Sequence, residues 1–195
     1  MKLCKLLFAV AGATVLFGAL VASAYAGRME LSSQTLGATW ATMNFSGGFG
    51  TIECEVVLRG SFHTRTLQKV EGTLVGYITE GNVNRCARGG ATVNRASEPW
   101  HIVYDSFVGT LPGITGVIQG VTGAEWTLRE PTFGITCTVR RETSSTALNY
   151  TLSSGVVTRV SVSGASPCGS FTGTTEGTTT NVNNGAGIRI TIRLI

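Results

Sequence analysis

The side chains with the widest chemical range in this sequence are its two histidines, His63 and His101, and its single aspartate, Asp105. A serine hydrolase needs a serine, a histidine and a carboxylate within hydrogen-bond reach of one another. His101 and Asp105 are four residues apart, which along a strand is about 13 Å. Such a set therefore forms only if a neighbouring strand or sheet curvature brings Asp105 to a histidine. We expect instead that His63 is a surface strand residue and that His101 is partly buried beside Trp100.

Paired carboxylates could support glycoside hydrolysis, and the candidates are Glu53, Glu55, Glu125 and Glu130. Glu53 and Glu55 share one strand face about 6.6 Å apart, a spacing that arises on any solvated strand. The G-x-S-x-G, H-E-x-x-H, P-loop and dinucleotide-binding motifs do not occur, and two histidines exclude a His-rich metal centre. The sequence thus predicts no enzyme, no cofactor, and no catalytic, cofactor-binding or metal site.

Basic residues recur on strand faces: Arg189 and Arg193 share one face, and Arg59, Arg65 and Lys69 lie on others. If the fold gathers them, the patch could hold an anionic polysaccharide or nucleic acid. No aromatic side chains are interleaved with them, which disfavours nucleic acid. Charges that prevent strand edges from pairing are the more typical explanation. The candidate partners are an anionic polysaccharide or another envelope protein.

Six aromatic side chains could form a platform on which sugars stack. Most of them fall in apolar alternating runs, where a core position is commoner. We therefore predict core packing for most of this set: Trp40, Tyr77, Trp100, Tyr104, Trp126 and Tyr150.

Four cysteines follow the first 26 residues, at positions 54, 86, 137 and 168. Cys54 and Cys86 are 32 positions apart, and Cys137 and Cys168 are 31 apart. The first cysteine of each pair lies in an alternating apolar run and the second in a Gly-rich or Ser-rich stretch. This parallel favours the disulfides Cys54–Cys86 and Cys137–Cys168, although four cysteines allow three pairings. A zinc site is less favoured because no C-x-x-C pair occurs.

Residues 1–26 have the pattern of a secretory signal peptide. Lys2 and Lys5 precede an apolar stretch over residues 6–21, and residues 24–26 (AYA) fit a cleavage site after Ala26. An uncleaved membrane anchor is the alternative. Export to the cell envelope or the medium also suits the disulfides. Residues 27–195 then form a single β-rich domain, and its net charge falls from +4 to +2 when the two lysines leave.

The rest of the chain alternates between apolar and polar residues with the period of two that is typical of half-buried strands. Residues 52–58 and residues 188–194 are the clearest examples, the latter with Ile188, Ile190, Ile192 and Leu194 on one face. Many short strands separated by Gly-rich turns predict an all-β antiparallel β-sandwich with two disulfides, or a barrel-like closure of the same strands. Further runs lie at 35–43, 62–70, 73–79, 101–108, 114–120, 124–129, 133–140, 147–153, 156–163 and 169–180.

Six short segments together resemble a group of exported, β-rich bacterial proteins without an assigned activity. The resemblance covers most of residues 45–195, and it implies an exported single domain and carries no site residues. The segments are 60–66 (GSFHTRT), 72–79 (GTLVGYIT), 99–101 (PWH), 109–116 (GTLPGITG), 133–137 (FGITC) and 190–195 (ITIRLI).

These observations favour an exported, non-enzymatic β-domain that serves as a surface or extracellular structural component or as a binding module. Two alternatives remain open. One is a small outer-membrane β-barrel, which a strand at the C-terminus would suit. The other is a pilus-type subunit completed by a donor strand from a neighbour, for which residues 35–43 are the candidate segment.

Overall fold

A computed structural model of the chain describes residues 27–48, 50–111, 113–140, 146–167 and 173–195. The predicted signal peptide lies outside these residues. The predicted all-β antiparallel class is confirmed, since every strand pairing is antiparallel.

The first elements are β1 (Arg28–Leu31), β2 (Thr35–Gly47), β3 (Gly50–Phe62), β4 (Thr66–Gln68), β5 (Leu74–Ala87), β6 (Gly90–Val93), a 3-10 turn η1 (Arg95–Ser97), β7 (Trp100–Thr110) and β8 (Gly113–Thr122). The remaining elements are β9 (Glu125–Glu130), β10 (Ile135–Arg140), β11 (Thr146–Ser153), β12 (Val156–Ala165), β13 (Gly173–Thr178), β14 (Asn181–Asn183) and β15 (Ile192–Leu194).

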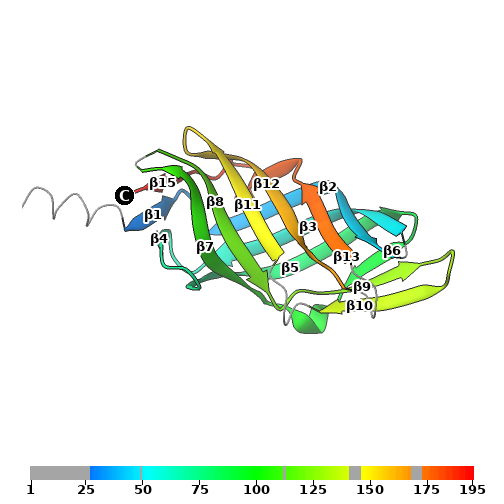
Figure 1. Ribbon diagram of the computed structural model, residues 1–195. Coiled ribbons are helices and arrows are strands. Elements are labelled where there is room, and N and C mark those ends of the chain that lie inside the picture. The colour runs from blue at the N-terminus through cyan, green and yellow to red at the C-terminus, as the bar shows by residue number, and fades with distance from the viewer. Residues whose placement is uncertain (1–26, 49, 112, 141–145, 168–172) are drawn as a thin grey trace, which may run out of the picture.

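The largest sheet closes on itself into a ring (Figure 1). Its strand order is β13-β12-β11-β8-β7-β5-β3-β2, and β13 also pairs with β2, from Gly173 opposite Gly47 to Gly177 opposite Met43. Strand β14 pairs with the other part of the same edge of β2. Each ring strand therefore has a hydrogen-bonded neighbour on both sides, and side chains alternate between the interior and the outer surface.

Large apolar side chains fill the interior of the ring. Trp40, Phe45 and Trp100 are almost fully buried, and the Trp126 ring lies 5.4 Å from that of Phe45 and 5.2 Å from that of Trp100 between centroids. A ring of eight strands is just wide enough for side chains to fill it. The interior is accordingly a packed core.

Two three-stranded sheets lie at opposite ends of the ring (Figure 1). The sheet β15-β1-β4 lies at one end, and it buries Met29, Leu31 and Ile192. The sheet β10-β9-β6 lies at the other end and buries Trp126 and Leu128. The buried residues of both small sheets belong to the same hydrophobic cluster as the interior of the ring.

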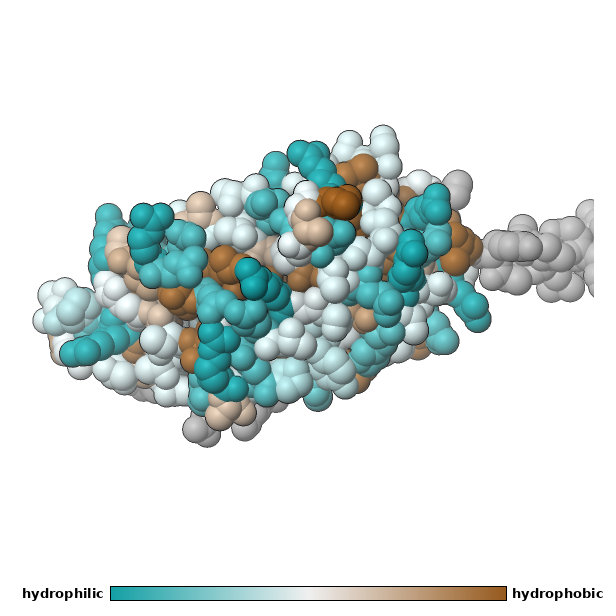
Figure 2. Space-filling model, turned by 180° about the vertical axis from the view of Figure 1, so that it is seen from behind, coloured by the Kyte–Doolittle hydropathy of each residue, from teal (hydrophilic) through white to brown (hydrophobic). Residues whose placement is uncertain are grey.

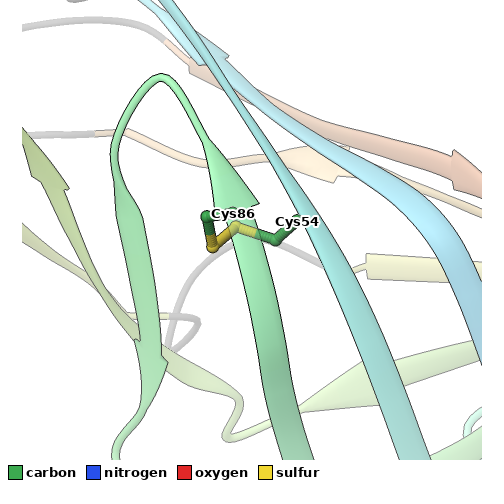
Figure 3. The surroundings of a disulfide bond; sticks show 2 residues. All are labelled: Cys54 and Cys86. Atoms are coloured by element: carbon green, nitrogen blue, oxygen red, sulfur yellow. A yellow bond between two sulfur atoms is a disulfide. The ribbon is translucent and has the colours of Figure 1, made fainter.

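The predicted disulfide Cys54–Cys86 is confirmed (Figure 3). The two cysteines are directly opposite in the register of β3 and β5, so the bond ties two neighbouring strands of the ring. Cys137 on β10 is disulfide-bonded as well. Its predicted partner, Cys168, lies outside the described residues, so that pairing stays a prediction.

Hydrophilic side chains cover much of the outer surface seen from behind, with apolar positions scattered between them (Figure 2). On β3 and β5 the outward positions include Glu53, Glu55, Arg59 and Glu80. No helix in the described part of the chain has the length and apolar content that a membrane crossing requires.

The predicted strand over residues 188–194 is wrong in its first half. Ile188 is 65% exposed, whereas Ile190 and Ile192 are buried. The Asn184 side-chain oxygen accepts a hydrogen bond from the Ile188 N–H, and the Ile188 carbonyl accepts one from the Asn184 N–H. These two bonds hold residues 184–188 as a turn, so the strand β15 begins only at Ile192.

Candidate functional site

The two histidines do not form a catalytic set with Asp105 within the described residues. His63, directly after β3, is exposed as predicted. His101 is also exposed, and the expectation of partial burial is wrong because its neighbour Trp100 points into the core and alternation turns His101 outward. Asp105 has one weak contact, a 3.5 Å hydrogen bond from the Ser106 hydroxyl.

Two of the candidate carboxylates pair with arginines on the outer surface. Glu53 and Glu55 pair with Arg88 and Arg85 at 3.8 and 3.1 Å. Hydrogen bonds from Asn84, then from Arg85, lower the pKa of Glu55. A general acid in glycoside hydrolysis needs a raised pKa, so this carboxylate is unsuited to that role.

The other two candidate carboxylates fix local backbone and side chains. Glu130 accepts hydrogen bonds from the backbone N–H groups of Thr132 and Phe133, at 2.8 and 2.7 Å. Hydrogen bonds from these two residues lower the pKa of Glu130. Glu125 accepts a 2.6 Å hydrogen bond from the Asn94 amide. Each carboxylate is thus occupied in holding a turn or loop.

The basic residues singled out in the sequence are spread over the molecule and mostly engaged. Arg59 pairs with Glu80 at 3.4 Å. Arg193 pairs with Glu30 at 2.7 Å. The remaining contacts are local: the Arg65 guanidinium donates to the Leu31 carbonyl, and the Lys69 ammonium lies 5.2 Å from the Phe107 ring centroid. The described residues therefore give no support to the predicted anionic ligand.

The aromatic set divides into five core residues and one surface residue. Trp40, Trp100, Tyr104, Trp126 and Tyr150 are all buried, so the prediction of core packing is confirmed for them. Tyr77 is the exception, since it is only half-buried and faces outward from β5.

Tyr77 lies between the two histidines of the chain. Its ring centroid is 4.9 Å from that of His63 and 5.4 Å from that of His101. His63 directly follows β3, Tyr77 lies on β5 and His101 on β7, and these three strands are neighbours in the ring. We call His63, Tyr77 and His101 the aromatic strip. It presents three contiguous unsaturated rings on the outer surface.

Two glycines allow β3 and β5 to approach beneath the strip. A Cβ atom at Gly60 would overlap the Tyr77 carbonyl, and one at Gly76 would overlap the Ser61 carbonyl. The register at this point places Ser61 opposite Tyr77 and Tyr77 opposite His101. Glycine at both positions is therefore what lets the sequence pack the strip tightly.

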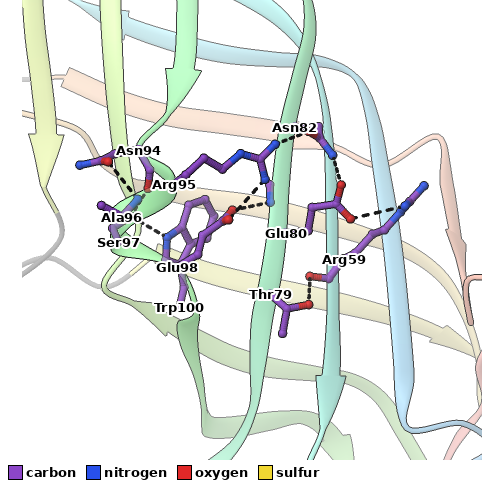
Figure 4. Close-up of polar contacts among 11 residues, drawn as sticks. Arg59, Thr79, Glu80, Asn82, Asn94, Arg95, Ala96, Ser97, Glu98 and Trp100 are labelled. Atoms are coloured by element: carbon purple, nitrogen blue, oxygen red, sulfur yellow. Dashed lines mark hydrogen bonds and ion pairs between the residues drawn. The ribbon is translucent and has the colours of Figure 1, made fainter.

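A polar network anchors the chain where β7 begins, next to His101 (Figure 4). The Trp100 indole N–H donates to the Ser97 hydroxyl at 3.0 Å. Glu98 accepts a 2.6 Å hydrogen bond from the Gly81 N–H and pairs with Arg95 at 3.3 Å. These contacts fix the start of β7 against β5, and so they fix His101 against Tyr77.

Sequence reasoning missed the strip as a unit. These residues lie far apart in the sequence, and only strand pairing brings them together. Among the described residues, no group of three or more His, Cys, Asp or Glu side chains could hold a metal ion.

Fold and surface together define an all-β antiparallel structure with a ring-like sheet and an exposed aromatic strip. No family model matches the chain, and no curated protein or solved structure is significantly similar to it.

Proposed function

We propose that the chain is an exported, non-enzymatic binding module and that the aromatic strip holds a glycan. A sugar ring has an apolar C–H face and a rim of hydroxyl groups. Tyr77 offers a flat apolar ring with a polar tip, and His63 and His101 offer nitrogen donors and acceptors on either side. The observation that carries this proposal is the presence of three contiguous rings on the outer surface, on or directly beside neighbouring strands of the ring.

The rigidity of the strip supports binding. Its members lie on or beside hydrogen-bonded ring strands, so little conformational entropy is lost when a ligand orders them. Nucleic acid is a poorer match, because it needs basic side chains free to neutralise phosphates, and Arg59 and Arg193 are paired with carboxylates.

The two alternatives from the sequence receive less support. A protein that spans the outer membrane with strands needs an apolar outer band, whereas charged side chains such as Glu55 and Arg59 face outward here. The candidate donor segment, residues 35–43, lies in β2 and pairs with β3 of its own chain.

We also propose a sandwich-like packing of the ring and a second disulfide. Opposite walls of the ring pack together like the two layers of a sandwich, which the large side chains in the interior support. A second disulfide joins Cys137 to Cys168, which the bonded state of Cys137 supports. Peptide mapping of the unreduced protein tests this pairing, and fractionation of expressing cells tests export and cleavage after Ala26.

Titration against a panel of immobilised oligosaccharides tests the binding function. We expect Tyr77→Ala to weaken binding of the recognised glycan by about tenfold, which corresponds to about 1.4 kcal/mol. The matched control is Phe133→Ala, which removes a 74% exposed aromatic ring from the β9–β10 turn and should bind like the wild type. Equal affinities for wild type and Tyr77→Ala, or no glycan bound at all, would refute the proposal.

A further inference from the structure

The turn between β14 and β15 contains the Asn-Gly pair Asn184-Gly185. Asparagine deamidates most readily before glycine, because glycine has no side chain to hinder its own backbone nitrogen. The turn itself requires both residues. Gly185 has a φ of +82°, which residues with a side chain rarely adopt. The Asn184 side chain accepts the hydrogen bonds that close the turn.

Deamidation of this pair is a reaction between its two residues. The Gly185 nitrogen loses its proton and attacks the Asn184 Cγ atom, so a bond forms between this nitrogen and Cγ while the bond from Cγ to Nδ2 breaks. Nδ2 leaves with a proton as ammonia, and the two residues form a succinimide ring. Water then opens the ring to aspartate or isoaspartate. Gly185 is exposed, so water reaches the turn.

Asn183 holds the attacking nitrogen. The Gly185 N–H donates a hydrogen bond to the Asn183 Oδ1 atom at 2.7 Å. Asn183 lies opposite Gly37 of β2, and a Cβ atom at Gly37 would lie 3.4 Å from the same oxygen. The missing side chain at Gly37 therefore leaves room for the Asn183 amide. Because the Gly185 nitrogen must break its hydrogen bond before it can attack, this contact slows the reaction.

The Asn184 carboxamide is held by backbone groups further along the turn. The N–H groups of Ala186 and Ile188 donate to its Oδ1 atom at 3.0 and 3.1 Å. Attack at Cγ places negative charge on this oxygen, and two backbone donors stabilise such an oxyanion. The Thr35 hydroxyl fixes the same residue through its main-chain carbonyl at 2.7 Å. The turn thus combines a stabilised electrophile with a restrained nucleophile.

We propose that Asn184 is a site of self-modification by deamidation and that the Asn183 side chain restrains the reaction while the turn is intact. Opening of the turn releases the Gly185 nitrogen, so the modification marks chains in which this region has loosened. The product carries an additional negative charge, and its isoaspartyl form lengthens the backbone that leads to β15. The reaction needs only water, so it is independent of any ligand at the aromatic strip.

Ageing of the mature protein at mildly alkaline pH, followed by peptide mass spectrometry, tests the proposal. We expect folded Asn183→Ala to deamidate at Asn184 about three- to tenfold faster than the wild type, the factor that corresponds to loss of one hydrogen bond. Asn183→Asp keeps an oxygen acceptor for the Gly185 N–H and should react as slowly as the wild type. The matched control is Asn181→Ala, which removes an exposed amide from the same strand and should also react like the wild type.

The same measurement in urea separates the effect of the turn from the effect of the local sequence. The unfolded wild type should deamidate at Asn184 faster than the folded wild type and at nearly the same rate as unfolded Asn183→Ala. Circular dichroism without urea establishes that each variant is folded. Equal rates for the wild type and Asn183→Ala in the folded state would overturn the role of Asn183. A wild type that reacts no faster in urea would show that the turn does not restrain Asn184, and the proposal would be wrong.

Discussion

Tyr77 on β5 lies directly opposite His101 on β7, and the two rings meet edge to face with their centroids 5.4 Å apart. The same tyrosine contacts His63 on its other side. Strand register alone brings these three residues together, because they lie far apart in the sequence. Anything that shifts the register of β3, β5 or β7 should therefore disperse the aromatic strip.

Substitution of Gly76 by alanine should destabilise the protein through a backbone overlap. The added Cβ atom would meet the Ser61 carbonyl, and the two strands would have to separate. We expect the free energy of unfolding, measured in urea, to fall by about 1–3 kcal/mol. The control is Gly90→Ala, where the new Cβ has nothing within 4 Å and an effect within about 0.5 kcal/mol is expected. Similar losses in both variants would contradict the close approach of β3 and β5.

Removal of the disulfide in Cys54→Ala/Cys86→Ala should also lower the free energy of unfolding. The bond closes a loop of 32 residues, so its loss should remove roughly 3–4 kcal/mol by relaxing the unfolded chain. Denaturant unfolding without reductant measures this. Wild-type stability in the double variant would show that the bond contributes nothing.

Acid should destabilise the protein partly through Glu130. Hydrogen bonds from Thr132 and Phe133 keep the pKa of Glu130 lower in the folded state than in the unfolded state. The stabilisation from Glu130 is therefore complete above the unfolded pKa, near 4.5, and is lost as the pH falls through the lower folded pKa. Glu130→Gln should make stability less dependent on pH between about 5 and 3. Thermal melts over this pH range measure the effect. If the melting temperature of Glu130→Gln falls with pH as steeply as that of the wild type, the prediction is wrong.

Gln119→Met should stabilise the protein, because Gln119 lies on the inward face of β8, opposite the buried Tyr104 and Leu148. The substitution keeps the length of the side chain and removes two buried polar atoms that lack partners. A gain of about 1–2 kcal/mol in the free energy of unfolding is expected. The control is Gln34→Met, because Gln34 donates a 3.0 Å hydrogen bond to the His63 carbonyl and its loss should not stabilise. A destabilised Gln119→Met protein would mean that the amide is satisfied in solution.

The strands and one disulfide could be predicted from local features of the sequence. Alternation over residues 52–58 predicts β3 because its period of two puts Ile52, Cys54 and Val56 on one buried face. The equal spacing and parallel contexts of the two cysteine pairs predicted Cys54–Cys86.

The closure of the ring and the aromatic strip could not be predicted in this way. Both depend on which strands pair. Strands β2 and β13 are far apart in the sequence, and the alternation pattern of each does not indicate that the other is its partner. Tyr77 in particular sits among apolar residues, and a bulge between Leu74 and Gly76 sets which face it occupies. A shift by one residue there would turn the tyrosine into the core.

The sheet β15-β1-β4 has a consequence for when the protein can finish folding. Its pairing brings Glu30 to Arg193, residues separated by 163 positions, and places the last strand beside the first. This sheet therefore cannot assemble on a nascent chain until the C-terminal residues have left the ribosome. Folding dominated by such distant pairings is slow, and a chain that completes its fold late stays unfolded for longer.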